Sequence, residues 1–106
     1  MKKALILAAG VMGLACGVVQ TAAADGAALY TAKLCTTCHG ADGKAPIMPS
    51  YPKLAGQNAD YSLQQVKDIR DGKRTNGGAA AMMGLVKGQN LSDADAKEIV
   101  TWLSTK

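Results

Sequence analysis

Five consecutive residues carry most of the reactive side chains of this 106-residue chain. Cys35, Cys38 and His39 fall in the segment CTTCH, and the whole sequence holds only three cysteines and one histidine. Cys-x-x-Cys-His is the attachment pattern of c-type haem. The two thiols add across the two vinyl groups of the porphyrin as thioethers, and the histidine supplies a nitrogen to the iron. The segment therefore predicts one haem c, covalently bound through Cys35 and Cys38.

Three other interpretations share these residues. A disulfide or a thioredoxin-type dithiol would use Cys35 and Cys38, but no alternation of strands and helices surrounds them. A zinc site usually needs four protein ligands, and Cys16 is the one cysteine outside the motif. A chance match to the motif is the third alternative. The motif favours haem over all three.

A methionine is the candidate for the sixth position of the iron, because the chain has no second histidine. The candidates are Met48, Met82 and Met83. A histidine and methionine pair is the cytochrome c arrangement and raises the reduction potential. Met48 follows His39 closely, in a loop expected to wrap the histidine side, whereas the other two can cross the opposite face. Plain core filling is the alternative for each methionine.

The first 24 residues are typical of a secretory signal peptide. Two lysines at positions 2 and 3 precede an apolar run over residues 4–19, and three alanines end the segment. The run is shorter than the roughly 20 residues that span a bilayer, which disfavours an uncleaved membrane anchor. A lipoprotein signal at Cys16 is disfavoured by Gly13, because such signals prefer a leucine-like residue there. We expect cleavage after Ala24 and export to the periplasm.

Cleavage of 24 residues from 106 would leave a single domain over residues 25–106, with 82 residues. The net charge would fall from +4 to +2, because two lysines leave with the signal. Nucleic-acid binding calls for a clustered basic face, so this weak charge offers no case for it. We expect the mature form to be a monomer that does not span a membrane.

The elements that must position the motif are all helical. Helical periodicity predicts helices over residues 25–37, over residues 58–71 and from Ser92 onward, and the long segments 40–56 and 73–90 are predicted to be loops. The expected buried stripes are Ala28, Leu29, Ala32 and Cys35; Leu63, Val66 and Ile69; and Ala96, Ile99, Val100 and Leu103, with Trp102 at the edge. A core this small needs an additional source of stability, and we expect the bound haem to supply it.

Two segments carry a resemblance to a known family. Residues 35–43 (CTTCHGADG) and 52–57 (PKLAGQ) resemble bacterial class I c-type cytochromes, and more narrowly the small monohaem proteins similar to one half of the dihaem cytochromes c. The similarity extends over essentially the whole of residues 25–106. It implies the cytochrome c fold, with three to four short helices and long loops wrapped around one covalently attached haem.

The resemblance also implies roles for single residues. The carbonyl of Pro52 would accept the free N–H of His39, and Leu54 would pack on the haem. The family's axial methionine precedes the last helix, which matches Met82, with Met83 as the alternative. Gly26 and Tyr30 on the first helix would cross the last helix closely, with an aromatic contact to Trp102.

The function that follows is electron transfer and not enzyme catalysis. An iron with both axial positions filled by protein changes oxidation state without binding a substrate. The partners would be redox proteins, both donors and acceptors. Exposed lysines could steer an acidic partner, or be simply solvated: Lys33, Lys44, Lys53 and Lys87. The alternatives are a haem c subunit of a larger dehydrogenase complex and a ligand-binding or peroxidase-like haem protein.

Overall fold

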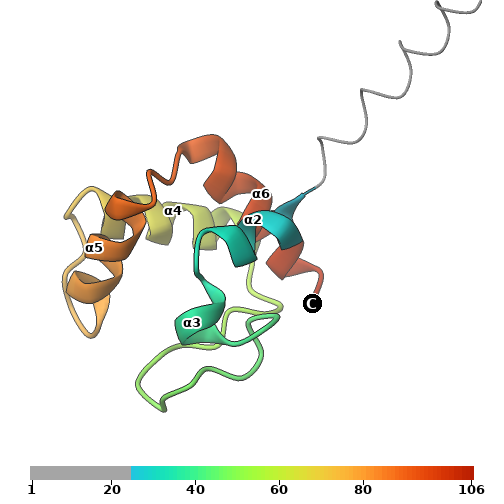
Figure 1. Ribbon diagram of the computed structural model, residues 1–106. Helices are drawn as coiled ribbons and strands as arrows, with labels where there is room; N and C mark the ends of the chain where they lie inside the picture. Colours follow the sequence, from blue (N-terminus) through green and yellow to red (C-terminus); the bar gives the residue numbers. More distant parts are fainter. Residues whose placement is uncertain (1–24) are drawn as a thin grey trace, which may run out of the picture.

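The computed structural model describes residues 25–106, and the signal peptide predicted for residues 1–24 lies outside this range. The described residues are helical without strands, which confirms the all-α class (Figure 1). The helices are α2 (Gly26–Ala32), α3 (Thr36–His39), α4 (Ala59–Arg70), α5 (Ala79–Gly88) and α6 (Asp93–Ser104).

The helix predicted over residues 25–37 is wrong in its extent, because the chain breaks after Ala32. Leu34 adopts a φ of 66°, in the left-handed region that side chains other than glycine rarely occupy. The amides around the break remain bonded: Leu34 donates to the Thr31 carbonyl and Cys35 to the Tyr30 carbonyl, each at 3.0 Å. The break turns the chain, so that α3 begins at a new angle to α2.

The loop predicted over residues 73–90 is also wrong, because most of it forms α5. The glycines at 77 and 78 lie before the helix begins, where they do not interrupt it. Gly84 lies inside α5, but an internal glycine costs only about 1 kcal/mol against alanine, and three alanines and a leucine in the same helix favour it. The described residues therefore form five helices and not the three to four expected.

Both remaining helices begin where their capping residues predict. The side-chain oxygen of Asn58 accepts from the amide of Tyr61 at 2.9 Å at the start of α4. The hydroxyl oxygen of Ser92 accepts from the amide of Asp95 at 3.0 Å at the start of α6. Each cap satisfies an amide that has no partner within its helix.

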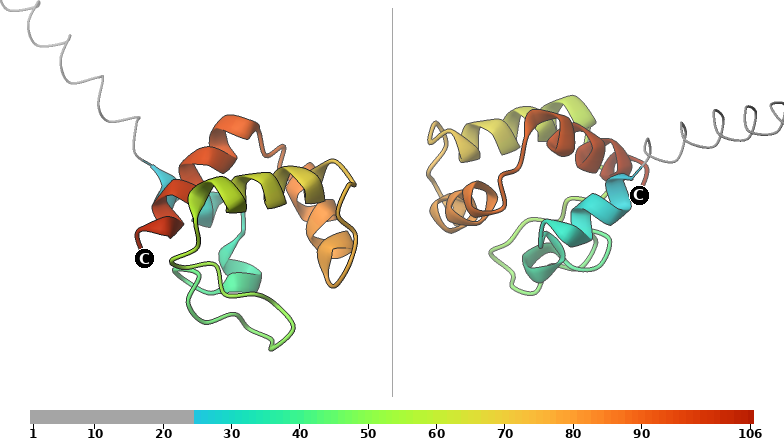
Figure 2. Two further views of the ribbon diagram at one scale, coloured as in Figure 1. Left: turned by 180° about the vertical axis from the view of Figure 1, so that it is seen from behind. Right: turned by 45° about the horizontal axis from the view of Figure 1, so that its top comes forward.

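The buried core lies where α6 meets α2 and α4 (Figure 2). We call its buried members the core cluster: Tyr30, Val86, Leu91, Ala96, Ile99 and Leu103. The stripe predicted for α6 is confirmed, since all four of its residues are buried. The stripe predicted for the first helix is wrong, because α2 buries Gly26 and Tyr30 while Ala28 and Ala32 are exposed.

Helices α2 and α6 cross without a side chain between them at Gly26. A Cβ at this position would overlap the Glu98 carbonyl oxygen and lie 2.5 Å from the Trp102 Cβ, so only glycine allows the approach. One turn later the rings of Tyr30 and Trp102 lie 5.2 Å apart at 48°. The close helix crossing with an aromatic contact is therefore present.

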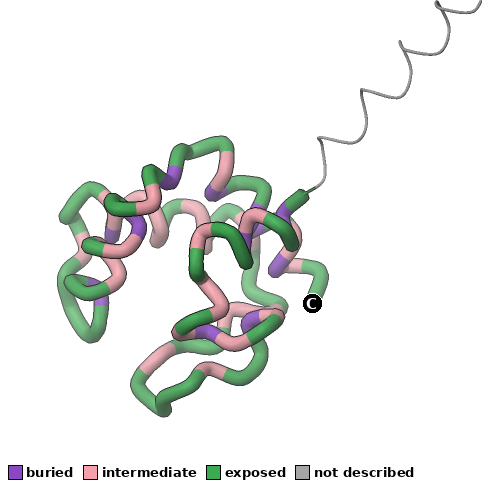
Figure 3. Tube along the Cα trace, viewed as in Figure 1, coloured by how far each residue is buried: buried purple, intermediate pink, exposed green. Residues whose placement is uncertain are grey.

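The segment 40–56 is the long loop that the sequence predicts, and only Gly43 is buried in it (Figure 3). The Gly43 carbonyl accepts from the amide of Leu54 at 2.8 Å, which closes the loop on itself. The amide of Gly56 donates to the Leu103 carbonyl at 2.9 Å, which fastens the loop to α6. No helix among residues 25–106 has the length and apolar character needed to cross a bilayer.

Candidate functional site

One helical turn presents both cysteines and the histidine of the motif. Cys35 caps α3, and its carbonyl accepts from the amides of Cys38 at 3.3 Å and His39 at 3.0 Å. Both cysteines are free and half-buried, and His39 is buried at 8% exposure. The two thiol side chains and the imidazole therefore all project from a single rigid turn of backbone.

The ring of His39 is held by the loop that follows it. Its Nδ1 lies 2.9 Å from the carbonyl oxygen of Pro52. Because a carbonyl oxygen can only accept, Nδ1 carries a hydrogen and donates it, which leaves Nε2 as the ring nitrogen available to a metal. A histidine held in this way has one tautomer and one ring orientation, as metal-binding histidines usually have.

Cys35 is a poor candidate for a redox-active thiolate. Its side chain packs against the core cluster. Burial is the main cause that raises the pKa of the Cys35 thiol to about 11, with a smaller contribution from the neighbouring Cys38. A dithiol of the thioredoxin type requires a lowered pKa. In residues 25–106, moreover, no three His, Cys, Asp or Glu side chains come together as a group that could hold a metal ion.

Tyr30 links α2 to the end of α3. Its hydroxyl donates to the Gly40 carbonyl oxygen at 2.7 Å, and its side chain is fully buried. Burial is the main cause that raises the pKa of Tyr30 to about 12, with smaller contributions from the charges of Cys35 and Asp42. The phenol therefore stays protonated and keeps donating at neutral pH.

The three candidate methionines lie in different surroundings. Met82 is half-buried on α5 and packs against the core cluster, as do Cys35 and Leu54. Met83 points elsewhere, since its sulfur lies 4.0 Å from the position that a Cβ on Gly72 would take. Met48 lies on the 40–56 loop and is 45% exposed. The structure thus brings Met82, Leu54 and Cys35 to one core and leaves Met48 at the surface.

Two residues near the site have roles that the sequence did not reveal. The Tyr51 ring lies 6.5 Å from the ring of His39 and also approaches Gly78 at the start of α5. Lys33 donates to the Gln89 carbonyl oxygen at 2.9 Å, so the interpretation of this lysine as solvated is wrong. The scarcity of aromatic residues, three tyrosines and one tryptophan, is the one sequence signal that could have pointed to Tyr51.

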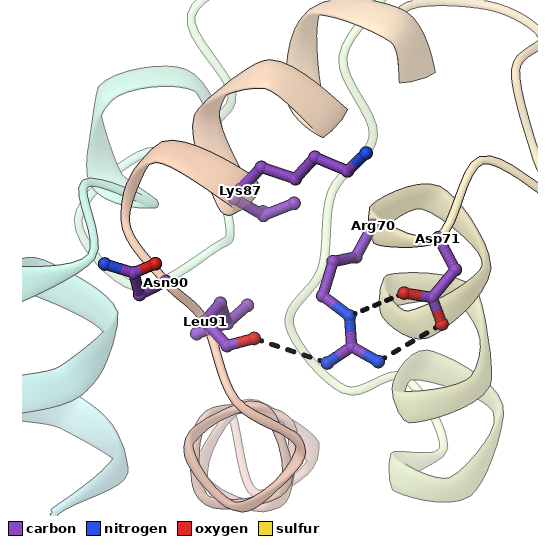
Figure 4. A pocket seen from close by; sticks show the side chains of 6 residues that line it. Arg70, Asp71, Lys87, Asn90 and Leu91 are labelled. Carbon is purple, nitrogen blue, oxygen red and sulfur yellow. Dashed lines mark hydrogen bonds and ion pairs between the residues drawn. The ribbon is translucent and has the colours of Figure 1, made fainter.

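A shallow pocket lies away from the motif, between the end of α4 and the end of α5 (Figure 4). The guanidinium of Arg70 occupies its rim, with two hydrogen bonds to Asp71 at 2.9 and 3.2 Å, one to Asp93 at 2.6 Å and one to the Leu91 carbonyl oxygen at 3.3 Å. These contacts connect α4 to α6. The polar groups of Arg70 at this pocket are therefore used to hold two helices together.

The donor set at the motif suits a c-type haem. It offers two free thiols, an imidazole whose Nε2 is available to a metal, and a half-buried thioether on another helix. Thioether linkage needs two free, reduced thiols on one short turn, and ligation by histidine needs a ring nitrogen that is free to face the metal. Each requirement is met by a described residue.

A family model described as Cytochrome c matches residues 23–106. Cytochrome c4 from Pseudomonas aeruginosa is 45% identical over 103 residues, which are 96% of this chain and 46% of that protein. Cytochrome c-553 from Nitratidesulfovibrio vulgaris is 38% identical over 104 residues, 98% of each chain. A thiosulfate dehydrogenase electron acceptor from Stutzerimonas stutzeri is 43% identical over 65 residues, 55% of this chain and 30% of that protein. The chain spans about half the length of the cytochrome c4 that it matches.

Proposed function

The chain belongs to the cytochrome c family, whose cofactor is a covalently attached haem c, and on that premise we propose that it is a periplasmic carrier of single electrons. The observation that carries this proposal is the His39–Pro52 hydrogen bond, formed beside two free thiols on the same turn. Electron transfer requires no substrate pocket, and the shallow pocket between the ends of α4 and α5 is lined by the ion pair of Arg70 and Asp71.

Each site residue has a proposed role. Cys35 and Cys38 would form the two thioethers, and His39 would bind the iron through Nε2. Met82 would supply a further ligand, which is supported by its packing on the same core cluster as Cys35. Leu54 covers the haem from that cluster, and Pro52 holds the histidine ring.

The chemistry that haem supplies when bound is a one-electron change between Fe(II) and Fe(III). The protein's part is to keep both axial groups in place through that change. Pro52 holds the His39 imidazole in one orientation, so that little rearrangement accompanies the change of charge. Met82, which lies on helix α5, would exclude small molecules that compete for its position on the iron.

Processing and location are part of the same proposal. Residues 1–24 direct export and are removed after Ala24, which leaves residues 25–106 as the mature domain. Attachment of haem to two thiols suits an oxidising compartment, where free thiols are otherwise converted to disulfides. The mass of the mature protein tests both statements, because it reports the cleavage site and the added haem together.

A second function is favoured by one relative. The chain is 43% identical over 65 residues to a protein named for accepting electrons from thiosulfate dehydrogenase. The alternative is therefore that this chain is the haem c subunit or acceptor of a dehydrogenase complex. Stoichiometric co-purification with a second polypeptide would favour it, whereas a monomer that exchanges electrons with several proteins would favour the free carrier.

The spectrum of the purified holoprotein tests the proposed function. Ferric protein should show the weak sulfur-to-iron band at the red end of the spectrum, and ferrous protein should not take up carbon monoxide readily. Immediate binding of carbon monoxide would overturn the carrier proposal and favour a ligand-binding or peroxidase-like haem protein.

A further inference from the structure

Helix α5, which bears both Met82 and Met83, is contacted at both of its ends by residues from the part of the chain that carries the motif. Its main packing partner is α4. Helices α3 and α5 lie on the same side of the α4–α6 pair, with the ribbon of α5 standing apart from that of α3 (Figure 1). Two side chains reach between these parts.

The first contact is at the start of α5. Tyr51, directly before Pro52 in the chain, is half-buried, and its ring lies 6.5 Å from the His39 ring. On the side of α5, a Cβ on Gly78 would lie 3.6 and 3.9 Å from two carbons of the same ring, which is ordinary packing distance. Gly78 is the N-cap of α5. Tyr51 thus lies between the histidine and the N-cap residue of the methionine helix.

The second contact is at the other end of α5. The ammonium of Lys33 donates to the carbonyl oxygen of Gln89, the C-cap of α5, at 2.9 Å. Asp95 of α6 lies 3.8 Å from the same ammonium, and the Lys33 side chain is only 23% exposed. Lys33 ends α2 two residues before Cys35. A charged donor in this half-buried position satisfies a helix-terminal carbonyl that α5 cannot satisfy itself.

We propose that Tyr51 and Lys33 are positioning residues that hold α5 against the motif and thereby keep its methionine on the iron. The inference rests on the proposed ligation by histidine and methionine, but it holds for Met82 and Met83 alike because both lie on α5. The two contacts set the fraction of molecules whose methionine is detached. An external ligand binds only that fraction, so its apparent affinity reports the fraction directly.

Imidazole titration of the ferric holoprotein measures this affinity. Lys33→Met keeps the unbranched stem and removes the donor, and Tyr51→Ala removes the ring. Each should tighten apparent imidazole binding several-fold, and the double variant by about tenfold or more, because the lost contacts no longer favour the attached state. The sulfur-to-iron band should weaken in parallel.

Two controls separate this role from a general loss of stability. Tyr51→Phe keeps the ring carbons that face Gly78 and should restore the affinity of the parent protein. Lys87→Met removes the same charge from an exposed lysine of α5 that forms no ion pair among residues 25–106, and it should leave imidazole binding unchanged.

The outcomes distinguish this inference from the proposed function. If the parent protein shows the sulfur band and resists imidazole, and Lys33→Met and Tyr51→Ala resist it equally, the positioning role is wrong while the ligation stands. If the parent protein lacks the band and binds imidazole at once, the proposed ligation itself is wrong and the inference is lost with it.

Discussion

The imidazole of His39 donates to the carbonyl of Pro52 at 2.9 Å, across 13 residues of chain. The loop between them is closed at Gly43, which has a φ of 78° and accepts the Leu54 amide. A Cβ at Gly43 would lie 2.8 Å from the Leu103 side chain. The orientation of the histidine therefore depends on a loop that is fastened to α6 and not on α3 alone.

Substitution of Pro52 should raise the reduction potential. Pro52→Ala keeps the carbonyl but frees the backbone φ, so the hydrogen bond to His39 loosens. The bond makes the imidazole a stronger donor and so favours Fe(III). Partial loss of a bond worth about 1 kcal/mol should raise the potential by roughly 10–40 mV, measured by redox titration. Pro49→Ala, at an exposed proline of the same loop, is the matched control. An unchanged or lower potential in Pro52→Ala would contradict the role of the carbonyl.

Variants of the two adjacent methionines should behave differently. Met82→Ala should abolish the sulfur-to-iron band, allow carbon monoxide binding by the ferrous form and lower the potential by on the order of 100 mV, since axial ligands tune it over a range of roughly 0.8 V. Met83→Ala should keep the band, because that sulfur lies near Gly72. If the band is lost in Met83→Ala alone, Met83 is the iron ligand. If the band persists in both variants, the ligand is Met48.

The crossing of α2 and α6 should tolerate no side chain at Gly26. Gly26→Ala places a methyl group against the Glu98 carbonyl and the Trp102 Cβ, which must shift α2 and should cost about 1–3 kcal/mol of unfolding free energy. Gly88→Ala is the matched helical control, because no atom beyond its chain neighbours and its own helix backbone lies within 4 Å of the added Cβ. It should be neutral or stabilising by about 0.5–1 kcal/mol. Equal urea-unfolding curves for the two variants would show that the crossing is not tight.

The ion pairs of Arg70 should make stability depend on pH in the acid range. Hydrogen bonds from Arg70 lower the pKa of both Asp71 and Asp93. A carboxyl group with a lowered pKa contributes stability above its unfolded value, about pH 3.9, and loses it as the pH falls through the folded value. Arg70→Met should therefore lower the urea midpoint at neutral pH.

The difference in urea midpoint between the parent protein and Arg70→Met should disappear well below pH 3.9, because both carboxyl groups are then protonated in the folded and the unfolded protein alike. Lys44→Met is the control, since its exposed ion pair with Asp42 spans 3.9 Å and should contribute little. A gap that persists unchanged in acid would assign the effect to packing of the Arg70 stem.

The local features of this fold were predictable from the sequence. Asn58 and Ser92 mark the starts of α4 and α6, because a capping side chain bonds to an amide only three residues ahead. The long 40–56 loop follows from its three prolines and its glycines. The stripe of α6 was correct because twelve residues provide enough periodicity to define a face.

Tertiary contacts decided the rest. The seven residues of α2 are too few for their periodicity to show which face of the helix is buried. The close approach of α6 at Gly26 decides which face is buried. The left-handed Leu34 has no local signal, because that backbone conformation is strained and persists only where surrounding contacts maintain it. Helix α5 was missed because its glycines suggest a loop, whereas packing on α4 stabilises the helix.

The sequence by itself determined the chemistry, because two thiols and an imidazole within one helical turn are brought together by local backbone geometry alone. Which carbonyl orients that imidazole, and which methionine packs on the same core cluster as Cys35, depends on residues 13 and more positions away. Contacts over such separations form only when the whole chain folds, so they were decided by the packing of α2 and α4 on α6 and of α5 on α4.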